Sequence, residues 1–168
     1  MKKLTIVRHA KSDWNFTELL DHERPINGRG RADAPFMAVN IMKSTGTPDL
    51  VISSYANRAV TTAIIFARAM YVPEEKIQIT TQLYDATAGK VMSVLQAIDD
   101  SYNNVMIFGH NPGLTNLVNY LSQTEYITDN LPTTGCVCFE FDIKSWKNLA
   151  QGMGKLVFFE YPKKNKNY

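Results

Sequence analysis

The feature of this sequence that most restricts its fold is a regular alternation of short apolar runs with longer amphipathic segments. The apolar runs are β-branched or aromatic and are bounded by turn residues, which is typical of strands. They occupy residues 4–7, 49–54, 77–80, 105–109, 136–141 and 155–161. Residues 29–43, 56–71, 89–100 and 112–123 repeat apolar side chains three and four apart, as one-sided helices do. The alternation predicts an α/β fold, a three-layer α/β/α sandwich around a six-stranded sheet.

The composition of the runs predicts how the strands pair. The first four runs are apolar on both faces, as expected of parallel strands covered by helices on both sides. Residues 142–154 join the last two runs without a helix long enough for a crossover, so we expect an antiparallel strand near the C-terminus of a mostly parallel sheet. The connections look short throughout, which leaves no segment for a closing lid and predicts an open site.

Length and composition predict one folded domain. The 168 residues, of which 45% are hydrophobic and 20% charged, fit a single domain at 1–162 followed by a short basic tail at 163–168. The net charge of +2 and the lack of a basic face with interleaved aromatics argue against nucleic-acid binding. Arg8 interrupts the first apolar run too early for a signal peptide, and no run is long enough for a membrane span. We expect a cytoplasmic protein of undetermined oligomeric state.

Charged and imidazole side chains follow three of the predicted strands. Arg8 and His9 end the first, Arg58 follows the second in the first turn of a helix, and His110 follows the fourth. Because parallel strands present their carboxyl ends at one edge of a sheet, these side chains should meet there. Neighbours in an ideal strand face opposite sides, so Arg8 and His9 can converge only where the strand has begun to turn.

This combination of groups suits phosphoryl chemistry. Two guanidiniums and the amides of helix N-termini can hold a dianion, and a neutral imidazole can attack phosphorus to form a phosphohistidine. Nearby arginines would also lower the pKa of the histidine and stabilise the charge of the transferring group. The sequence therefore predicts a phosphate site with a nucleophilic histidine.

Several stretches resemble the histidine phosphatase superfamily, which has the phosphoglycerate mutase-like fold. They are LTIVRHAKSDWN at 4–15, SSYANRAVTTA at 53–63 and FGHNPGL at 108–114. RPINGRGRADAP at 24–35, LYDA at 83–86 and GMGKLVFFEYP at 152–162 are similar to the SixA-type phosphohistidine phosphatases within it. The chain differs from the superfamily pattern at Ala10, where glycine is usual, and at Tyr55, where proline is usual.

The resemblance implies roles for individual residues. His9 would be the nucleophile, Arg8 and Arg58 would bind phosphate, and His110 would complete the pocket. Asp85, in the loop after the third strand, is a candidate general acid, but it could equally cap the helix expected to begin near Ala88.

Two further residues are candidate substrate contacts. Arg24 lies in the polar stretch DHERPING, which could fold over the site. Asn15 occupies the place of a phosphate-contacting asparagine in phosphoglycerate mutases. We interpret Trp14 and Trp146 as packing residues, and Cys136 and Cys138 as buried thiols.

No cofactor or metal ion is expected. His22 reads as a surface histidine, and a site combining it with His9 and His110 would place a cation beside two arginines. Gly28 and Gly30 lack the third glycine and the preceding strand of a dinucleotide-binding loop.

The sequence therefore predicts a metal-independent phosphatase that acts through a covalent phosphohistidine on His9. Its expected substrate is phosphohistidine on a partner protein. A small-molecule phosphomonoesterase with the same mechanism is the alternative. A non-catalytic phosphate-binding module is a weaker one, and a mutase is weaker still because it would need a closed site.

Overall fold

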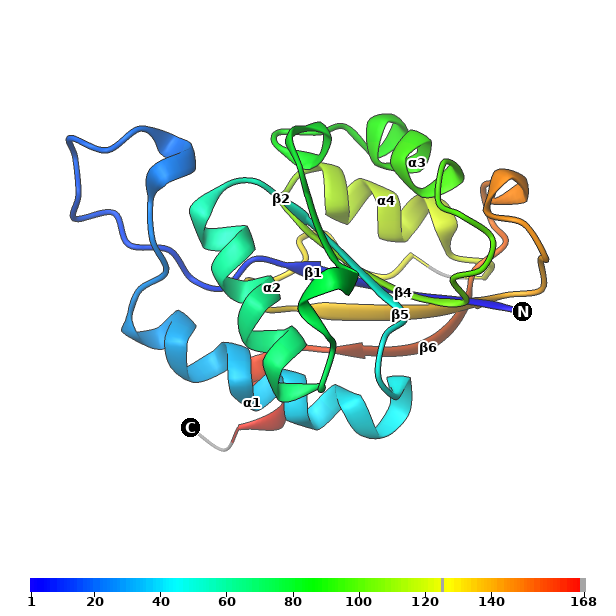
Figure 1. Cartoon of the computed structure of the whole chain (residues 1–168), viewed down its shortest axis with the longest axis horizontal. Helices are drawn as coiled ribbons and strands as arrows, with labels where there is room; N and C mark the ends of the chain where they lie inside the picture. The colour runs from blue at the N-terminus through cyan, green and yellow to red at the C-terminus, as the bar shows by residue number, and fades with distance from the viewer. Residues whose placement is uncertain (125, 167–168) are drawn as a thin grey trace.

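A computed structural model describes residues 1–124 and 126–166 of the chain as a six-stranded sheet with helices on both faces (Figure 1). The strands are β1 (Lys2–Arg8), β2 (Leu50–Ser54), β3 (Ile77–Thr80), β4 (Asn104–Gly109), β5 (Cys136–Phe141) and β6 (Lys155–Glu160). The α-helices are α1 (Gly28–Thr45), α2 (Asn57–Ala69), α3 (Ala88–Gln96), α4 (Gly113–Leu121) and α5 (Pro162–Asn165). Short 3₁₀ helices are η1 (Asp21–Glu23), η2 (Glu74–Lys76), η3 (Thr81–Leu83) and η4 (Trp146–Asn148).

The strand order is β3-β2-β4-β1-β5-β6. Strands β1 to β4 pair in parallel, β5 is antiparallel to β1, and β6 is antiparallel to β5. The predicted fold class, a mostly parallel six-stranded sheet with an antiparallel strand near the C-terminus, is confirmed. The carboxyl ends of β1, β2 and β4, which are neighbours in the sheet, lie together at one edge.

The two faces of the sheet bury separate apolar layers. Figure 1 shows α1 and α2 on one face and α3 and α4 on the other. Central strand β4 contributes to both layers, because successive side chains of a strand point to opposite faces. Val105 and Ile107 pack with the α3 and α4 layer, and Met106 and Phe108 with the α1 and α2 layer. This two-sided burial explains why the strand sequence is continuously apolar.

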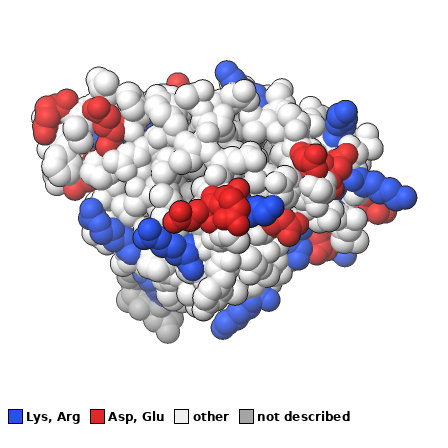
Figure 2. Space-filling view, viewed as in Figure 1, with Lys and Arg blue, Asp and Glu red and all other residues white. Residues whose placement is uncertain are grey.

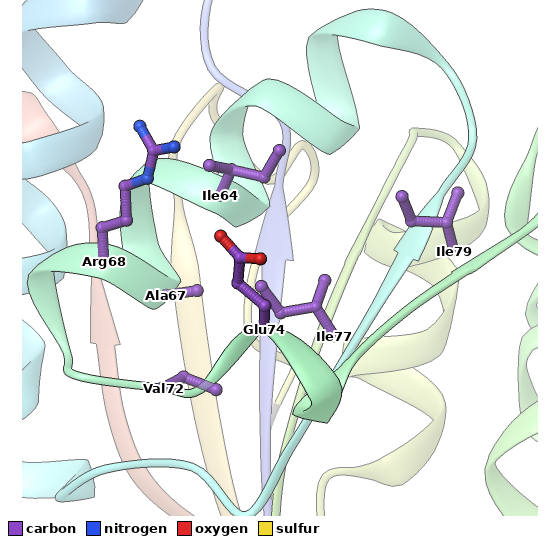
Figure 3. A pocket seen from close by; sticks show the side chains of 7 residues that line it. All are labelled: Ile64, Ala67, Arg68, Val72, Glu74, Ile77 and Ile79. Atoms are coloured by element: carbon purple, nitrogen blue, oxygen red, sulfur yellow. The ribbon is translucent and has the colours of Figure 1, made fainter.

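Strand β3 differs from the expectation that all four parallel strands are buried on both faces. It pairs with β2 alone and lies at the edge of the sheet, so Ile79 is 54% exposed. Beside it, apolar side chains of α2 and β3 line a cavity of about 320 Å³, with Arg68 and Glu74 among its lining residues (Figure 3). None of the residues that line this cavity comes from the predicted phosphate site.

The connection between β1 and α1 is the main departure from the expected short loops. Residues 9–27 extend well beyond the carboxyl end of β1, as the blue segment of Figure 1 shows. The two ends of this loop are fastened together, since the Asn27 amide donates to the Lys11 carbonyl at 2.8 Å. Gly30 allows this approach, because a Cβ there would lie 2.5 Å from the same carbonyl oxygen. A loop whose ends pair in this way can be long and still ordered.

The last described helix, α5, packs against α1. Within the basic tail, the Lys166 ammonium lies 2.7 Å from the buried carboxylate of Asp33, and residues 167–168 lie outside the described part. Cys136 and Cys138 are buried free thiols, and burial raises the pKa of both. In residues 1–124 and 126–166, no helix is long and apolar enough to cross a membrane.

Candidate active site

His9 is the first residue after β1. Its backbone amide still pairs with Gly109 of β4, at 3.1 Å, and the next amide, that of Ala10, donates to the Thr62 hydroxyl at 2.9 Å. The chain therefore leaves the strand while it is held from both sides. Arg8 donates from Nη1 to the Leu131 carbonyl at 2.8 Å. Arg8 and His9 converge on one hollow because the strand turns here.

The protonation state of His9 follows from its contacts. Nδ1 lies 2.8 Å from the carbonyl oxygen of Ala10, which can only accept a hydrogen bond, so Nδ1 carries the ring proton. The lone pair is then on Nε2, which faces the Nε of Arg58 at 3.4 Å. Burial, and then the nearby His110, Arg58 and Arg8, lower the pKa of His9 to about 3. At neutral pH the imidazole is neutral, and its basic nitrogen faces the arginine.

His110 lies beside His9, with the ring centroids 5.2 Å apart. Its Nε2 is 2.7 Å from the hydroxyl of Ser54 at the end of β2, so two strand ends fix this ring. Burial and the charge of Arg58 lower its pKa to about 4. Nδ1 is buried without a hydrogen-bond partner among the described residues, which leaves one polar atom for a bound group.

Asp21 joins two of the arginines. Its carboxylate lies 3.0 Å from Nη2 of Arg58 and 2.9 Å from Nη2 of Arg24, and it accepts the Tyr84 hydroxyl at 2.6 Å. Burial opposes ionisation of this carboxyl, but the hydrogen bonds from Tyr84, Arg24 and Arg58 hold its pKa far below the usual range. The same contact raises the pKa of Tyr84 to about 12. The carboxylate thus holds both guanidiniums at the site.

Asp21 and Tyr84 were not among the residues predicted from the sequence. Asp21 stands three residues before Arg24, a spacing that suits an ion pair within one helical turn, and that was the available signal. Tyr84 reaches Asp21 across 63 residues of sequence, so no local pattern could reveal it.

The site has two adjoining parts. We call the first the histidine hollow; it has a volume of about 200 Å³. Its lining includes Arg8, His9, Lys11, Ser12, Trp14, Arg24, Arg58, His110, Asn111 and Thr133. A second hollow of about 380 Å³ is lined by Asp21, Arg58, Tyr84, Asp85, His110 and Asn111. The structure therefore brings together five of the seven predicted residues in the histidine hollow, and places Asp85 in the hollow beside it.

Asp85 is exposed and has no partner for its carboxylate among the described residues. The helix-capping interpretation is wrong, because α3 is capped by Thr87, whose hydroxyl accepts from the Lys90 amide at 3.2 Å. Asp85 adopts a left-handed backbone, with φ of 50°. Its neighbour Ala86 is packed so closely by Gly113 that any Cβ on that glycine would collide with the Ala86 carbonyl.

Asn15 and Trp14 lie on the exposed part of loop 9–27. Asn15 is not among the residues that line either hollow; its backbone amide donates to the Asp13 carboxylate at 2.9 Å. Trp146 is fully buried, as expected, but Trp14 is 68% exposed and stacks against the Arg24 guanidinium, 3.6 Å from its ring centroid. Trp14 therefore packs against an arginine of the site at the surface, and not in the core as Trp146 does.

His22 is half-buried and stacks on Tyr55, with 5.2 Å between ring centroids. Its ring also lies 6.2 Å from that of Tyr84. Within the described ranges, no group of three histidine, cysteine, aspartate or glutamate side chains could hold a metal ion.

Burial of the two neutral histidines makes folding stability pH-dependent. Their folded pKa values lie below the ordinary 6.5, so the unfolded chain binds more protons from pH 6.5 down to about 4 for His110 and to about 3 for His9. Stability therefore falls as the pH falls through this window, by up to about 2 kcal/mol per histidine at pH 5. Denaturant unfolding at pH 7.5 and pH 5 measures the loss. His110→Asn should lose less between the two pH values, and an equal loss in both proteins would contradict the prediction.

The chain is similar in sequence and in fold to several known proteins. Residues 4–91 match the model of the histidine phosphatase superfamily (branch 1). An uncharacterized chloroplastic protein of Arabidopsis thaliana is 32% identical over 72% of this chain, which spans 59% of that protein's length. A solved SixA from Agrobacterium tumefaciens, described as a phosphohistidine phosphatase, shares 24% identity over 96% of this chain and 98% of its own, with a TM-score of 0.81.

Two solved phosphatases with bound oxyanions share the fold. The protein histidine phosphatase SixA complexed with tungstate has a TM-score of 0.82 at 20% identity, covering 98% of this chain and 99% of its own. A mycobacterial glucosyl-3-phosphoglycerate phosphatase complexed with VO₃ has a TM-score of 0.70 at 14% identity, covering 96% of this chain and all of its own. The fold is shared across both, and the match to the family model covers more than half of the sequence. The chain belongs to the histidine phosphatase superfamily.

Proposed function

We propose that this protein is a metal-independent phosphatase that forms a covalent phosphohistidine on His9. The observation that carries the proposal is the hydrogen bond from His9 Nδ1 to the Ala10 carbonyl, which leaves Nε2 unprotonated in a hollow lined by arginines. Nε2 accepts a hydrogen bond from Nε of Arg58 at 3.4 Å, so its lone pair points toward the guanidinium that would hold a phosphoryl group. This arrangement is what a nucleophile that attacks phosphorus requires.

The residues of the histidine hollow would have different roles in such a reaction. Arg8, Arg24 and Arg58 would hold the phosphoryl oxygens and stabilise their charge as Nε2 of His9 attacks. A P–N bond forms as the bond to the leaving group breaks, and the leaving group takes a proton from solvent water, to which the later attacking water returns one. Water then attacks phosphorus, the P–N bond breaks with its electron pair returning to Nε2, and inorganic phosphate leaves. His110, adjacent to His9, would donate from Nδ1 to an equatorial oxygen once it is protonated.

We propose phosphohistidine on a partner protein as the substrate. The imidazole of a phosphohistidine takes up a proton near neutral pH, so its departure needs no strong acid. The shared fold with a protein histidine phosphatase supports this choice. So does the exposure of Trp14, which leaves part of the wall of the histidine hollow open to solvent. Small phosphomonoesters are the alternative, supported by the phosphatase of a phosphorylated sugar derivative that has the same fold.

Single-turnover dephosphorylation compares these two substrate classes. We expect a phosphohistidine protein to be hydrolysed at least about tenfold faster than a small alkyl phosphate, with no effect of a chelator, because its leaving group is the easier to expel. Faster hydrolysis of the small ester would favour the alternative. A wild-type protein that binds phosphate and turns over neither substrate would instead be a phosphate-binding module.

Asp85 can be tested through the leaving group. If its carboxyl protonates a departing alkoxide, Asp85→Asn should lower the rate on an alkyl phosphate by about 10²-fold. Phosphohistidine hydrolysis should change little in the same variant. Asp129→Asn provides a control for the loss of one carboxylate from an exposed loop. Equal rates for wild type and Asp85→Asn on the alkyl phosphate would exclude the acid role.

A further inference from the structure

A groove of about 390 Å³ adjoins the histidine hollow, and it contains basic side chains that the proposed reaction does not use. We call it the basic groove and define it by Arg8, Lys11, Arg29 and Lys163, with Pro132 and Tyr161 in its walls. Arg8 and Lys11 line both the groove and the histidine hollow. The two spaces therefore form one continuous surface that begins at the phosphate site.

The cations of the basic groove are poorly neutralised by the protein itself. Lys11 and Lys163 make no ion pair or side-chain hydrogen bond within the described part of the chain, and Arg8 contacts a neutral carbonyl. Arg29 pairs with Asp33 at 3.4 Å, but that carboxylate is buried and is also held by Lys166. Figure 2 shows basic side chains over the first part of α1. A groove of this kind attracts anions.

The walls of the groove indicate what kind of anion it takes. Pro132 and Tyr161 provide carbon surface between the cations, and the charges come from three separate segments: the end of β1, the start of α1 and the start of α5. A lone phosphate is bound by donors that converge, as in the histidine hollow. Charges spread along a partly apolar groove suit an extended polypeptide with several carboxylates.

We propose that the basic groove binds an acidic segment of the protein that carries the phosphohistidine, and so selects the substrate. This inference rests on the proposed function, since the groove is useful for selection only if the phosphohistidine enters the adjoining hollow. Binding in the groove lowers KM for acidic partners, whereas the reacting groups at His9 are untouched.

The test uses two phosphohistidine peptides that differ only in having glutamates or glutamines on both sides of the phosphohistidine. In Arg29→Gln/Lys163→Gln we expect kcat/KM for the acidic peptide to fall about tenfold, through KM, at low salt. The neutral peptide and a small phosphomonoester should keep their rates within about twofold. The control Lys43→Gln/Lys144→Gln removes the same charge from exposed positions outside the groove. Lys163→Gln alone, at an exposed position, guards against a folding defect from the loss of the Arg29–Asp33 pair.

Other results of this test would overturn the groove proposal. Equal losses on acidic and neutral peptides, or no loss on either, would overturn the groove proposal while the phosphatase remains. A loss seen with a small ester bearing a second phosphate, but not with the acidic peptide, would assign the groove to small molecules. Fluorescence anisotropy measures binding of the acidic phosphohistidine peptide to the His9→Ala protein. This measurement tests the groove even if the wild type shows no turnover.

Discussion

His9→Ala should reduce turnover by about 10⁴-fold or more, the largest effect expected of any single substitution in this protein. Nε2 of His9 is the atom placed to form the bond to phosphorus, because it carries no proton and points toward Arg58 in the histidine hollow. Acid-sensitive, alkali-stable labelling of the protein by a phosphorylated substrate should be present in wild type and lost in the variant. Single-turnover kinetics and this label are the measurements.

His22→Ala is a matched control, because it removes an imidazole that stacks on Tyr55 outside the histidine hollow. It should retain both turnover and label. Thermal unfolding should show that His9→Ala is folded, since removing a neutral buried ring leaves no charge unpaired. A His9→Ala protein that is folded and still labelled would refute the proposed intermediate.

Arg58→Ala should reduce kcat/KM by about 10²- to 10³-fold, the second largest expected effect. Arg58 faces Nε2 of His9 and lines both hollows, so its charge lies where the phosphoryl oxygens would develop theirs. Part of the loss should come from weaker anion binding. Tungstate and phosphate should then inhibit the variant with higher inhibition constants than they have for the wild type. Arg58→Lys should recover little, because a point charge cannot replace the planar fork that contacts Asp21 with two nitrogens.

Arg68→Ala is the control for Arg58→Ala, since Arg68 is exposed further along the same helix. Its kcat/KM should stay within about twofold of wild type. A similar loss in both variants would show that the stability of α2, rather than phosphate binding, underlies the effect.

The fold and the centre of the site were predictable from the sequence for one reason. Strand periodicity determines which residues lie at the carboxyl end of a parallel strand. His9, Arg58 and His110 follow three neighbouring parallel strands, so they lie at the same edge of the sheet. Their resemblance to a known family added roles but did not change the positions.

The parts that were wrong depend on contacts between distant segments. Burial of β3 depends on which strands flank it, and it has a neighbour on one side only. The length of the β1 connection was misjudged because loop 9–27 carries no strand or α-helix, and its order comes from pairing of its own ends. The capping of α3 is the exception, because it is a local contact: Thr87, two residues after Asp85, accepts the Lys90 amide.

The sequence by itself determined the α/β class and which strands are followed by charged and imidazole side chains. It also determined that a histidine and arginines lie at one edge of the sheet. These follow from local periodicity and from parallel pairing. The tertiary structure alone decided that Nε2 of His9 is unprotonated and points toward Arg58, that Asp21, itself bonded to Tyr84, holds Arg58, and that unpaired cations continue from the phosphate site into a groove. The reason is physical: hydrogen-bond direction, burial and unbalanced charge arise from side chains many residues apart, which pattern within a segment cannot specify.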